Sequence, residues 1–207
     1  MVLEIAILTM SSKNGGYCVA GIEIGNGRWI RLVSDDVNTH GALNNSDIQY
    51  LNGERCKPLD VVRVCIAKYF PIEHQPENAL IDSRIRWEKI GTTTVENILR
   101  IHPAENHEVL FGNQYNYITE AGIYKVDHSL ILVRVTNFNI VHPEGQRVKA
   151  NFTYRGTQYL DISVTDPEYY SVVGTWHTDN AILVISLPES PYNGKYYYKF
   201  VAKIFPI

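Results

Sequence analysis

The stretch CVAGIEIGNGRWIRLVS, residues 18–34, predicts two β-strands joined by a tight turn. β-Branched and aromatic residues, which favour strands, lie on both sides of GNG at residues 25–27. A short turn rich in glycine and asparagine is typical of a hairpin. The second strand carries Trp29 between Arg28 and Arg31. The fold is therefore expected to contain a hairpin that presents an aromatic ring and two cations.

Strand-like runs recur along the rest of the chain, and few segments favour a helix. Short helices are expected only at residues 92–101, where Thr93 and Glu96 fit a capping box, and just after Asp166. Residues 71–91 contain two prolines and predict an irregular connection. Strands and helices do not alternate, so the pattern favours a mainly β architecture with small barrels. The expected strands cover residues 2–9, 17–24, 28–34, 59–70, 129–136, 148–156, 157–166, 181–189 and 196–205.

The composition is that of a folded protein without a strong excess of either charge. Of the 207 residues, 45% are hydrophobic and 20% are charged, and the formal net charge is −3. This excludes a disordered chain and argues against coating nucleic acid through bulk charge. A local basic groove is still compatible, because affinity depends on cations near phosphates. The N-terminal apolar run is short and lacks a preceding basic segment, so a cytoplasmic protein without a membrane segment is expected.

Motifs for catalysis or for a bound metal are absent from the sequence. Cys18, Cys56 and Cys65 are odd in number and form no CxxC pair, so no internal disulfide and no zinc site are expected. His102 and His107 have no third ligand nearby in the sequence, and no HExxH, GxSxG or phosphate-binding glycine loop occurs. We therefore expect no cofactor, no metal and no enzymatic activity, while the dispersed carboxylates leave a two-metal nuclease open.

Five segments, taken in order, are similar to one family of prokaryotic proteins. They are GGYCVAGIEIGNGRWIRLVS, LDVVRV, HQPEN followed by Trp87, YRGTQYLDISVTDP and the terminal YYYKFVAKIF. Together they resemble the dual OB-containing domain family, with a departure at Leu32, where the family pattern has proline. The resemblance implies two tandem, packed OB-like β-barrels with one or two short helices. The first barrel is expected at residues 1–91, a helix and connecting loop at 92–121, and the second barrel at 122–207.

The resemblance also implies a function. It predicts a non-catalytic module that binds nucleic acid or senses nucleotides, as part of a bacterial anti-phage or conflict system. The expected partner is single-stranded DNA or RNA, or a nucleotide, and a protein partner from the same defence system is a further expectation. The alternative is an adaptor that docks a partner effector through its barrels, and a small-molecule-binding or hydrolytic domain is a third class. Exposed rings clustered with cations would favour nucleic acid, whereas an exposed apolar patch without cations would favour the adaptor.

The first candidate site for nucleic acid is the hairpin at the start of the chain. Trp29 and Arg31 share one face of their strand, because side chains alternate between faces. A ring that stacks on a base beside a cation that neutralises a phosphate is the combination that OB-fold grooves use. The alternative interpretation places Trp29 in the barrel core, with Arg31 extending to water.

The second candidate site is the polar segment EHQPENALIDSRIRW. The amides of Gln75 and Asn78 can read base edges, or they can satisfy backbone groups of a structured loop. Arg84, Arg86 and Trp87 again offer cations and a ring. In the alternative interpretation, Trp87 closes one end of a barrel and only the arginines bind.

The third candidate site is the predicted hairpin YRGTQYLD. It places Tyr154, Arg155 and Tyr159 around a glycine turn, and loop tips on a rigid sheet are common binding positions. An ordinary pair of tyrosines on neighbouring strands is the alternative.

Lysines alternate with aromatic residues at the end of the chain. Lys195, Lys199 and Lys203 are expected on one strand face. A solvated face that protects an edge strand is favoured over a binding surface.

Overall fold

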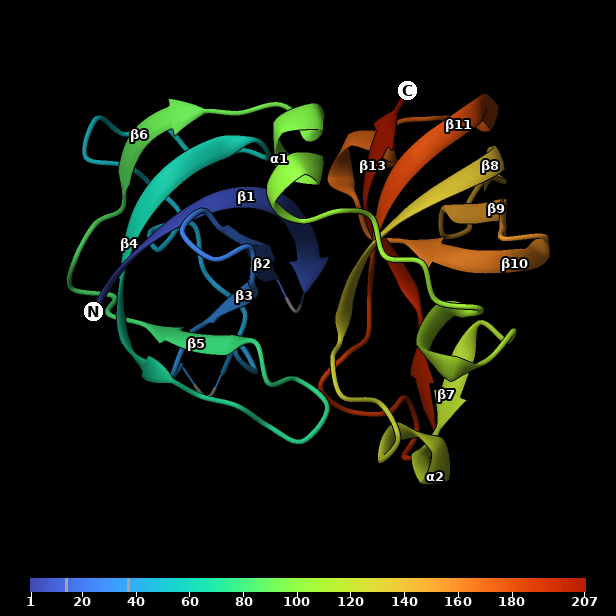
Figure 1. The fold of residues 1–207 in the computed structure, drawn as a ribbon, viewed down its shortest axis with the longest axis horizontal. Coiled ribbons are helices and arrows are strands. Elements are labelled where there is room, and N and C mark those ends of the chain that lie inside the picture. Colours follow the sequence, from blue (N-terminus) through green and yellow to red (C-terminus); the bar gives the residue numbers. More distant parts are fainter. Residues whose placement is uncertain (14, 37) are drawn as a thin grey trace. The chain divides into compact units, whose positions relative to one another are not determined.

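The chain folds into two compact units made mainly of β-strands (Figure 1). A computed structural model describes residues 1–13, 15–36 and 38–207. The first unit consists of Met1–Ile72 and Pro76–Pro103, and the second consists of Glu73–Gln75 and Ala104–Ile207. The expected fold class, mainly β with tandem OB-like barrels, is confirmed.

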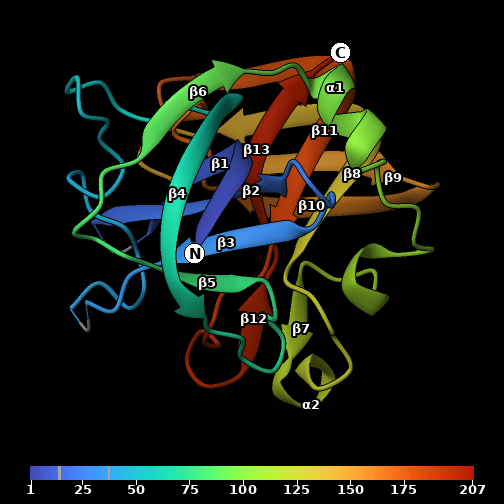
Figure 2. The ribbon, with the colours of Figure 1, turned by 60° about the vertical axis from the view of Figure 1, so that its left-hand side comes forward.

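The first unit is a five-stranded barrel. Its elements are β1 (Val2–Lys13), β2 (Gly16–Glu23), β3 (Trp29–Val33), β4 (Asp60–Tyr69), β5 (Asn78–Ile81), β6 (Glu88–Thr92) and α1 (Val95–Ile101). Neighbouring strands follow the order β1-β2-β3-β5-β4, and the pairing of β4 with β1 closes the ring. β6 pairs with the first half of β4, on the edge opposite to β1 (Figure 2). β3 and β5 run parallel, and the other pairs are antiparallel.

The second unit contains another closed five-stranded barrel. Its elements are η1 (Leu110–Gly112), β7 (Tyr117–Thr119), α2 (Glu120–Ile123), β8 (Leu130–His142), β9 (Lys149–Tyr154), β10 (Thr157–Val164), η2 (Pro167–Tyr169), β11 (Gly174–Ser186), β12 (Tyr196–Tyr198) and β13 (Phe200–Pro206). The barrel order is β10-β13-β11-β8-β9, and β7 pairs with β12 in a separate small sheet. Among the barrel pairs, only β10 and β13 are parallel.

The two barrels share one topology although their sequences show no obvious repeat. When the barrel strands of each unit are numbered from its N-terminal side, both give the order 1-2-3-5-4 with strands 3 and 5 parallel. This is a five-stranded Greek-key barrel, the architecture of the OB fold. The barrels differ in their connections: the one between strands 3 and 4 is longer in the first unit, from Val33 to Asp60, and the one between strands 4 and 5 is longer in the second unit, where it contains β12.

Two expectations about local structure were wrong. The region 71–91 is not simply irregular, because Asn78–Ile81 forms β5 and β6 begins at Glu88. Its two prolines lie outside both strands, and β5 is stabilised by a parallel partner, β3, that is distant in sequence. The helix expected at 92–101 is α1, but its N-cap is Thr94, whose hydroxyl accepts a hydrogen bond from the Asn97 amide.

Alternation along the strands fills each barrel with apolar side chains. In the first unit, the core includes Ile30 and Leu32 of β3 together with Trp87. In the second unit, it includes Tyr154 and Tyr159 with many β-branched residues. Large rings therefore occupy the barrel interiors, as expected where only five strands enclose a packed core.

The expectation that Lys195, Lys199 and Lys203 form a solvated strand face was wrong for two of the three lysines. Lys195 is exposed, but Lys199 is only 1% exposed and Lys203 only 4%. Lys203 forms ion pairs with Asp166 at 3.1 Å and with Glu168 at 2.6 Å. Lys199 donates from Nζ to carbonyl oxygens of residues 110 and 113. Both ammonium groups are buried because each has several oxygen partners.

Other features concern the thiols and the helices. Cys18, Cys56 and Cys65 are free thiols. Burial is the main cause that raises the pKa of Cys56, to about 12.

Within the described ranges, no helix has the length and apolar character needed to cross a bilayer.

Replacing Asp166 with alanine is expected to cost about 3–5 kcal/mol of unfolding free energy, because the buried Lys203 would lose its buried counter-charge and keep only the exposed carboxylate of Glu168. Asp166 also accepts hydrogen bonds from the amides of Glu168 and Ile204. Urea denaturation measures the loss. The control Asp179→Ala removes a carboxylate whose side chain is 88% exposed, and it should change stability by less than about 0.5 kcal/mol. Equal losses in the two variants would contradict the buried pair.

Lys199 is expected to make stability depend on pH. Burial lowers its pKa to about 7, whereas an unfolded lysine titrates near 10.4. Between these values the unfolded chain binds more protons, so this residue's contribution to stability rises with pH, by up to about 1.4 kcal/mol per unit. Below pH 7 the lysine is protonated in the native state as well, so its contribution to stability no longer changes with pH. The difference in unfolding free energy between wild type and Lys199→Met, measured in urea from pH 7 to 9, should grow in favour of wild type. A constant difference would contradict the expectation.

Candidate functional site

Trp29 and Arg31 lie on the outer face of β3, but they do not form an exposed platform. Ile30 and Leu32 point into the core, so the alternation places the other two side chains outside it. Arg31 is only 5% exposed, with its guanidinium 2.9 Å from Cys18 Sγ and 3.6 Å from a Glu77 carboxylate oxygen. A guanidinium engaged in these buried contacts is not available to a phosphate.

The ring of Trp29 is half-buried against the end of α1. It makes an edge contact with His102, with ring centroids 5.4 Å apart, and His102 Nδ1 lies 2.9 Å from the Gly27 carbonyl oxygen. Gly27 has φ +71°, and a Cβ there would lie 2.4 Å from the Ile101 carbonyl oxygen. The GNG turn thus requires glycine because α1 ends directly against it.

The polar segment at 73–87 is divided between buried and exposed residues. Gln75, Asn78 and Trp87 are all buried, and Gln75 donates to the Leu187 carbonyl within the second unit. These three side chains fit the structural alternative. The two arginines of the segment are exposed.

Those exposed arginines already have local partners. Arg84 forms a two-pronged hydrogen bond to Asp82, which lowers the pKa of that carboxyl to about 2. Arg86 donates to the Ser46 carbonyl. Both guanidinium groups lie at the surface of the first unit, where a phosphate could still reach them.

The hairpin between β9 and β10 presents its arginine and buries its tyrosines. Tyr154 and Tyr159 are 2% and 1% exposed. Arg155 is exposed at the tip, next to Gly156, and its guanidinium contacts the Asn106 side chain. Of the three residues, only Arg155 is accessible to a ligand.

The buried tyrosines of this hairpin anchor the segment that precedes β7. The Tyr154 hydroxyl donates to the Glu105 carbonyl, and the Tyr159 hydroxyl donates to the Asn113 carbonyl and accepts from the Leu110 amide. Lys199 adds bonds to the Leu110 carbonyl and to both oxygens of Asn113. A segment with little regular structure is therefore held in one conformation by side chains from the barrel.

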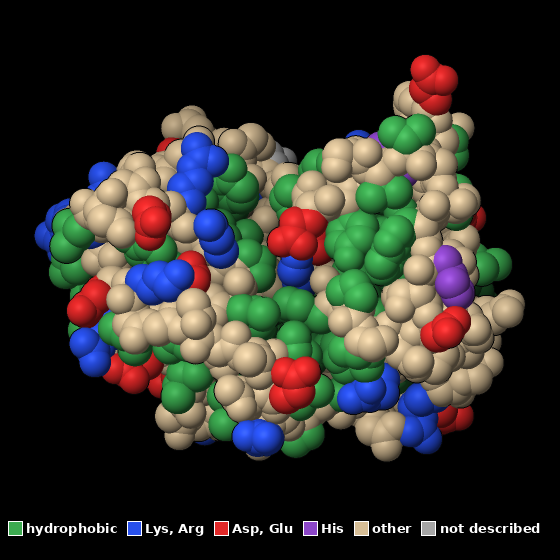
Figure 3. Space-filling model, turned by 90° about the horizontal axis from the view of Figure 1, so that it is seen from above, with side chains coloured by type: hydrophobic (Ala, Val, Ile, Leu, Met, Phe, Trp, Pro, Cys, Tyr) green, Lys and Arg blue, Asp and Glu red, His purple; other side chains and the backbone are tan. Residues whose placement is uncertain are grey.

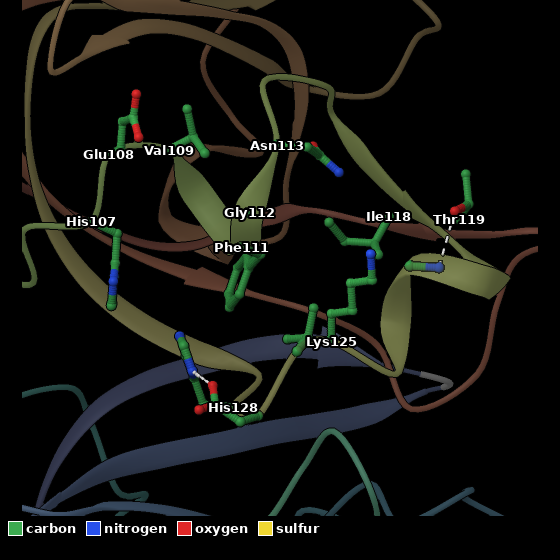
Figure 4. A pocket seen from close by; sticks show the side chains of 13 residues that line it. His107, Glu108, Val109, Phe111, Gly112, Asn113, Ile118, Thr119, Lys125 and His128 are labelled. Carbon is green, nitrogen blue, oxygen red and sulfur yellow. Dashed lines mark hydrogen bonds and ion pairs between the residues drawn. The ribbon is translucent and has the colours of Figure 1, made fainter.

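This anchored segment forms one wall of a pocket of about 590 Å³ in the second unit. His107 and His128 lie on one side of Phe111, and Lys125 lies on the other (Figure 4). Asn113 and Thr119 add further polar groups to the lining. The pocket thus combines two imidazoles, an exposed ammonium and an amide around an aromatic ring.

A cluster of tyrosines covers the small sheet of β7 and β12. Tyr117 lies 4.6 Å from Tyr196 and 6.2 Å from Tyr198, measured between ring centroids. Tyr115 stacks on Tyr117 at 5.7 Å with an interplanar angle of 14°, and Tyr192 contacts Tyr198. We call these five residues the tyrosine cluster. Tyr115 and Tyr192 are each 64% exposed, so ring faces are available to a ligand.

Sequence reasoning missed the tyrosine cluster and the pocket. In YYYKF, alternation buries Tyr197 and directs Tyr196 and Tyr198 outward, and that pattern was a usable signal. The partner strand, β7, lies far away in sequence, and nothing in the residues 115–119 alone indicated the pairing.

Charges of both signs are dispersed over one face of the molecule (Figure 3). On the face that Figure 3 shows, Lys and Arg side chains alternate with Asp and Glu side chains and do not merge into one basic band. This agrees with the formal net charge of −3. Any binding of a polyanion must therefore depend on local groups.

Comparison with known proteins identifies the family. No curated protein matches the chain. Among solved structures, one match is a murine DNA-binding protein bound with double-stranded DNA; it is 7% identical, the alignment covers 100% of this chain and 98% of that chain, and the TM-score is 0.38. A likeness at that level carries no argument about function. The family model of the dual OB-containing domain matches residues 3–204. The chain therefore belongs to the dual OB-containing domain family.

Proposed function

We propose that this chain is a non-catalytic module that binds single-stranded DNA or RNA, or nucleotides, and that the tyrosine cluster is its main stacking surface. One observation carries the proposal. Tyr192, Tyr196 and Tyr198 lie in or beside the connection between strands 4 and 5 of the second barrel. In OB folds that connection is one of the elements that contact oligonucleotides.

The chemistry of the tyrosine cluster supports this proposal. Every base has a π-face, so exposed aromatic rings bind single strands with little dependence on sequence. Lys195 is exposed immediately before β12 and can neutralise a phosphate beside a stacked base. Rings with a neighbouring cation are the combination that the sequence suggested for Trp29 and Arg31, now at another place in the fold.

Of the site residues that the sequence suggested, the exposed arginines fit best as phosphate contacts outside the cluster. These are Arg84, Arg86 and Arg155. The buried candidates act in this proposal by supporting the barrels. The role in a bacterial defence system, the adaptor alternative and the cytoplasmic location stay predictions from the sequence.

The double variant Tyr115→Ala/Tyr196→Ala is expected to weaken binding of a single-stranded 20-mer by about 1–3 kcal/mol per lost base stack. Fluorescence anisotropy with labelled DNA and RNA measures the affinity. Tyr115→Phe/Tyr196→Phe keeps both ring faces and should bind like wild type. Tyr69→Ala removes an exposed tyrosine of the first unit and is the matched control. Wild-type affinity in the double alanine variant would refute the stacking surface.

Lys195→Ala is expected to reduce the salt dependence of the same binding. Each cation that contacts a single-strand phosphate contributes about 0.7 to the slope of log affinity against log salt concentration. A titration series over salt concentration should therefore show a slope smaller by about that amount, with little change between sequences. The control is Lys57→Ala, which removes an exposed lysine of the first unit. An unchanged slope in Lys195→Ala would exclude a phosphate contact at this residue.

A further inference from the structure

Three potential metal ligands converge at one side of the pocket in the second unit. They are the Glu105 carboxylate and the imidazoles of His107 and His128, with one ligand atom of each within 4.8 Å of the others. The Glu105 Oε2 atom lies 3.0 Å from His107 Nε2 and 3.9 Å from His128 Nε2. Ligands at 2.0–2.1 Å from a tetrahedral zinc ion lie roughly 3.3 Å apart, so small side-chain rotations bring all three into range.

The backbone on which these ligands lie is held in place by the barrel. The Glu105 amide donates to the Leu132 carbonyl at 2.7 Å, and the Glu105 carbonyl accepts from the Tyr154 hydroxyl. His128 precedes Ser129, whose carbonyl accepts from the Leu187 amide at 2.9 Å. The donors therefore stay together without the help of a ligand, which reduces the ordering cost of binding.

A neighbouring carboxylate orients one of the imidazoles. His128 Nδ1 lies 2.5 Å from Asp127 Oδ1, which leaves Nε2 directed toward Glu105. A carboxylate on the far nitrogen of a histidine is the usual outer partner of a metal-bound imidazole, where it sets the tautomer and the ring direction. The rings of His107 and His128 stack with centroids 5.6 Å apart, and Phe111 lies 5.5 Å from His128.

We propose that Glu105, His107 and His128 bind one Zn²⁺ ion, with the fourth coordination position open toward the pocket. Two imidazoles and one carboxylate are a donor set that Zn²⁺ prefers, and three protein ligands with one open position define a site that can take water or an anionic ligand atom. Both histidines line the pocket, and Lys125 lies across it. The ammonium group of Lys125 adds a positive charge to the lining, which would favour an anionic ligand in the pocket.

This proposal revises the expectation that the chain has no metal site. From the sequence, His102 and His107 are not expected to bind a metal together for want of a third ligand nearby, and in the structure His102 contacts Trp29 in the first unit. The second imidazole comes instead from the turn before β8. The cysteines play no part, so the ligands are only nitrogen and oxygen.

The test is zinc binding by the full chain after removal of metals with a chelator. Isothermal titration with ZnCl₂, and metal analysis after dialysis, should give one Zn²⁺ per chain. His107→Ala and His128→Ala should each weaken binding at least tenfold, and Asp127→Asn should weaken it about 10- to 100-fold through the loss of orientation. The matched control is His177→Ala, because His177 is an exposed histidine of the second unit that pairs with Asp179 and should leave binding unchanged.

Two further measurements keep the outcome decisive. His107→Gln and His128→Gln preserve the side-chain volume and repeat the test if an alanine variant does not fold, which a thermal melt of the metal-free protein detects. Co²⁺ in place of Zn²⁺ should give visible absorption bands of a tetrahedral ion without a thiolate charge-transfer band. No zinc binding by wild type, a zinc affinity equal to that of wild type in both histidine variants, or a thiolate band would overturn the proposal.

Discussion

The buried ammonium group of Lys199 holds together the pocket wall and the small sheet of the second unit. Its Nζ atom donates to the Leu110 carbonyl and to both oxygens of Asn113, within 2.9 Å. The Lys199 amide donates to the Asn116 carbonyl, directly before β7. Lys199, which directly precedes β13, thus fixes the pocket wall and holds the start of β7 near β12. The tyrosine cluster and the pocket depend on the same anchor, because without it the segment would have unsatisfied carbonyl groups near the barrel.

The same constraint explains why so many conspicuous residues are structural. A barrel of only five strands encloses a small interior, and large rings fill it efficiently. Trp87 closes the core of the first barrel, and Tyr154 and Tyr159 serve the second by filling it and by anchoring residues 105–113. Hydroxyl groups of buried tyrosines need partners, and the adjacent segment supplies backbone groups that need partners as well. The tyrosine hydroxyls and the backbone groups of the segment therefore satisfy one another's hydrogen bonds.

Most of the fold was predictable from sequence, because it depends on local alternation. The hairpins of β2–β3 and β9–β10 and the turn after Asp166 follow from period-two patterns and turn residues. β5 was missed because its stability comes from a parallel partner that is distant in the chain. The candidate site was less predictable. Alternation shows that Trp29 and Arg31 share a face, but it does not show what covers that face, and here Glu77 and His102 do.

The two barrels have the same topology, and they differ in the segments that connect their strands. The strands of both units close the barrels and pack their cores, so the differences between the two units are concentrated in the segments that connect the strands. In the first barrel the connection between strands 4 and 5 is short, and its residues Glu73–Gln75 belong to the second unit. There His74 packs on Tyr197 and bonds to the Pro188 carbonyl, behind the outward-facing tyrosines of β12. In the second barrel the equivalent connection is longer and carries β12 with the exposed tyrosines. Tyr192, Tyr196 and Tyr198 therefore lie on a connection between barrel strands rather than on a barrel strand.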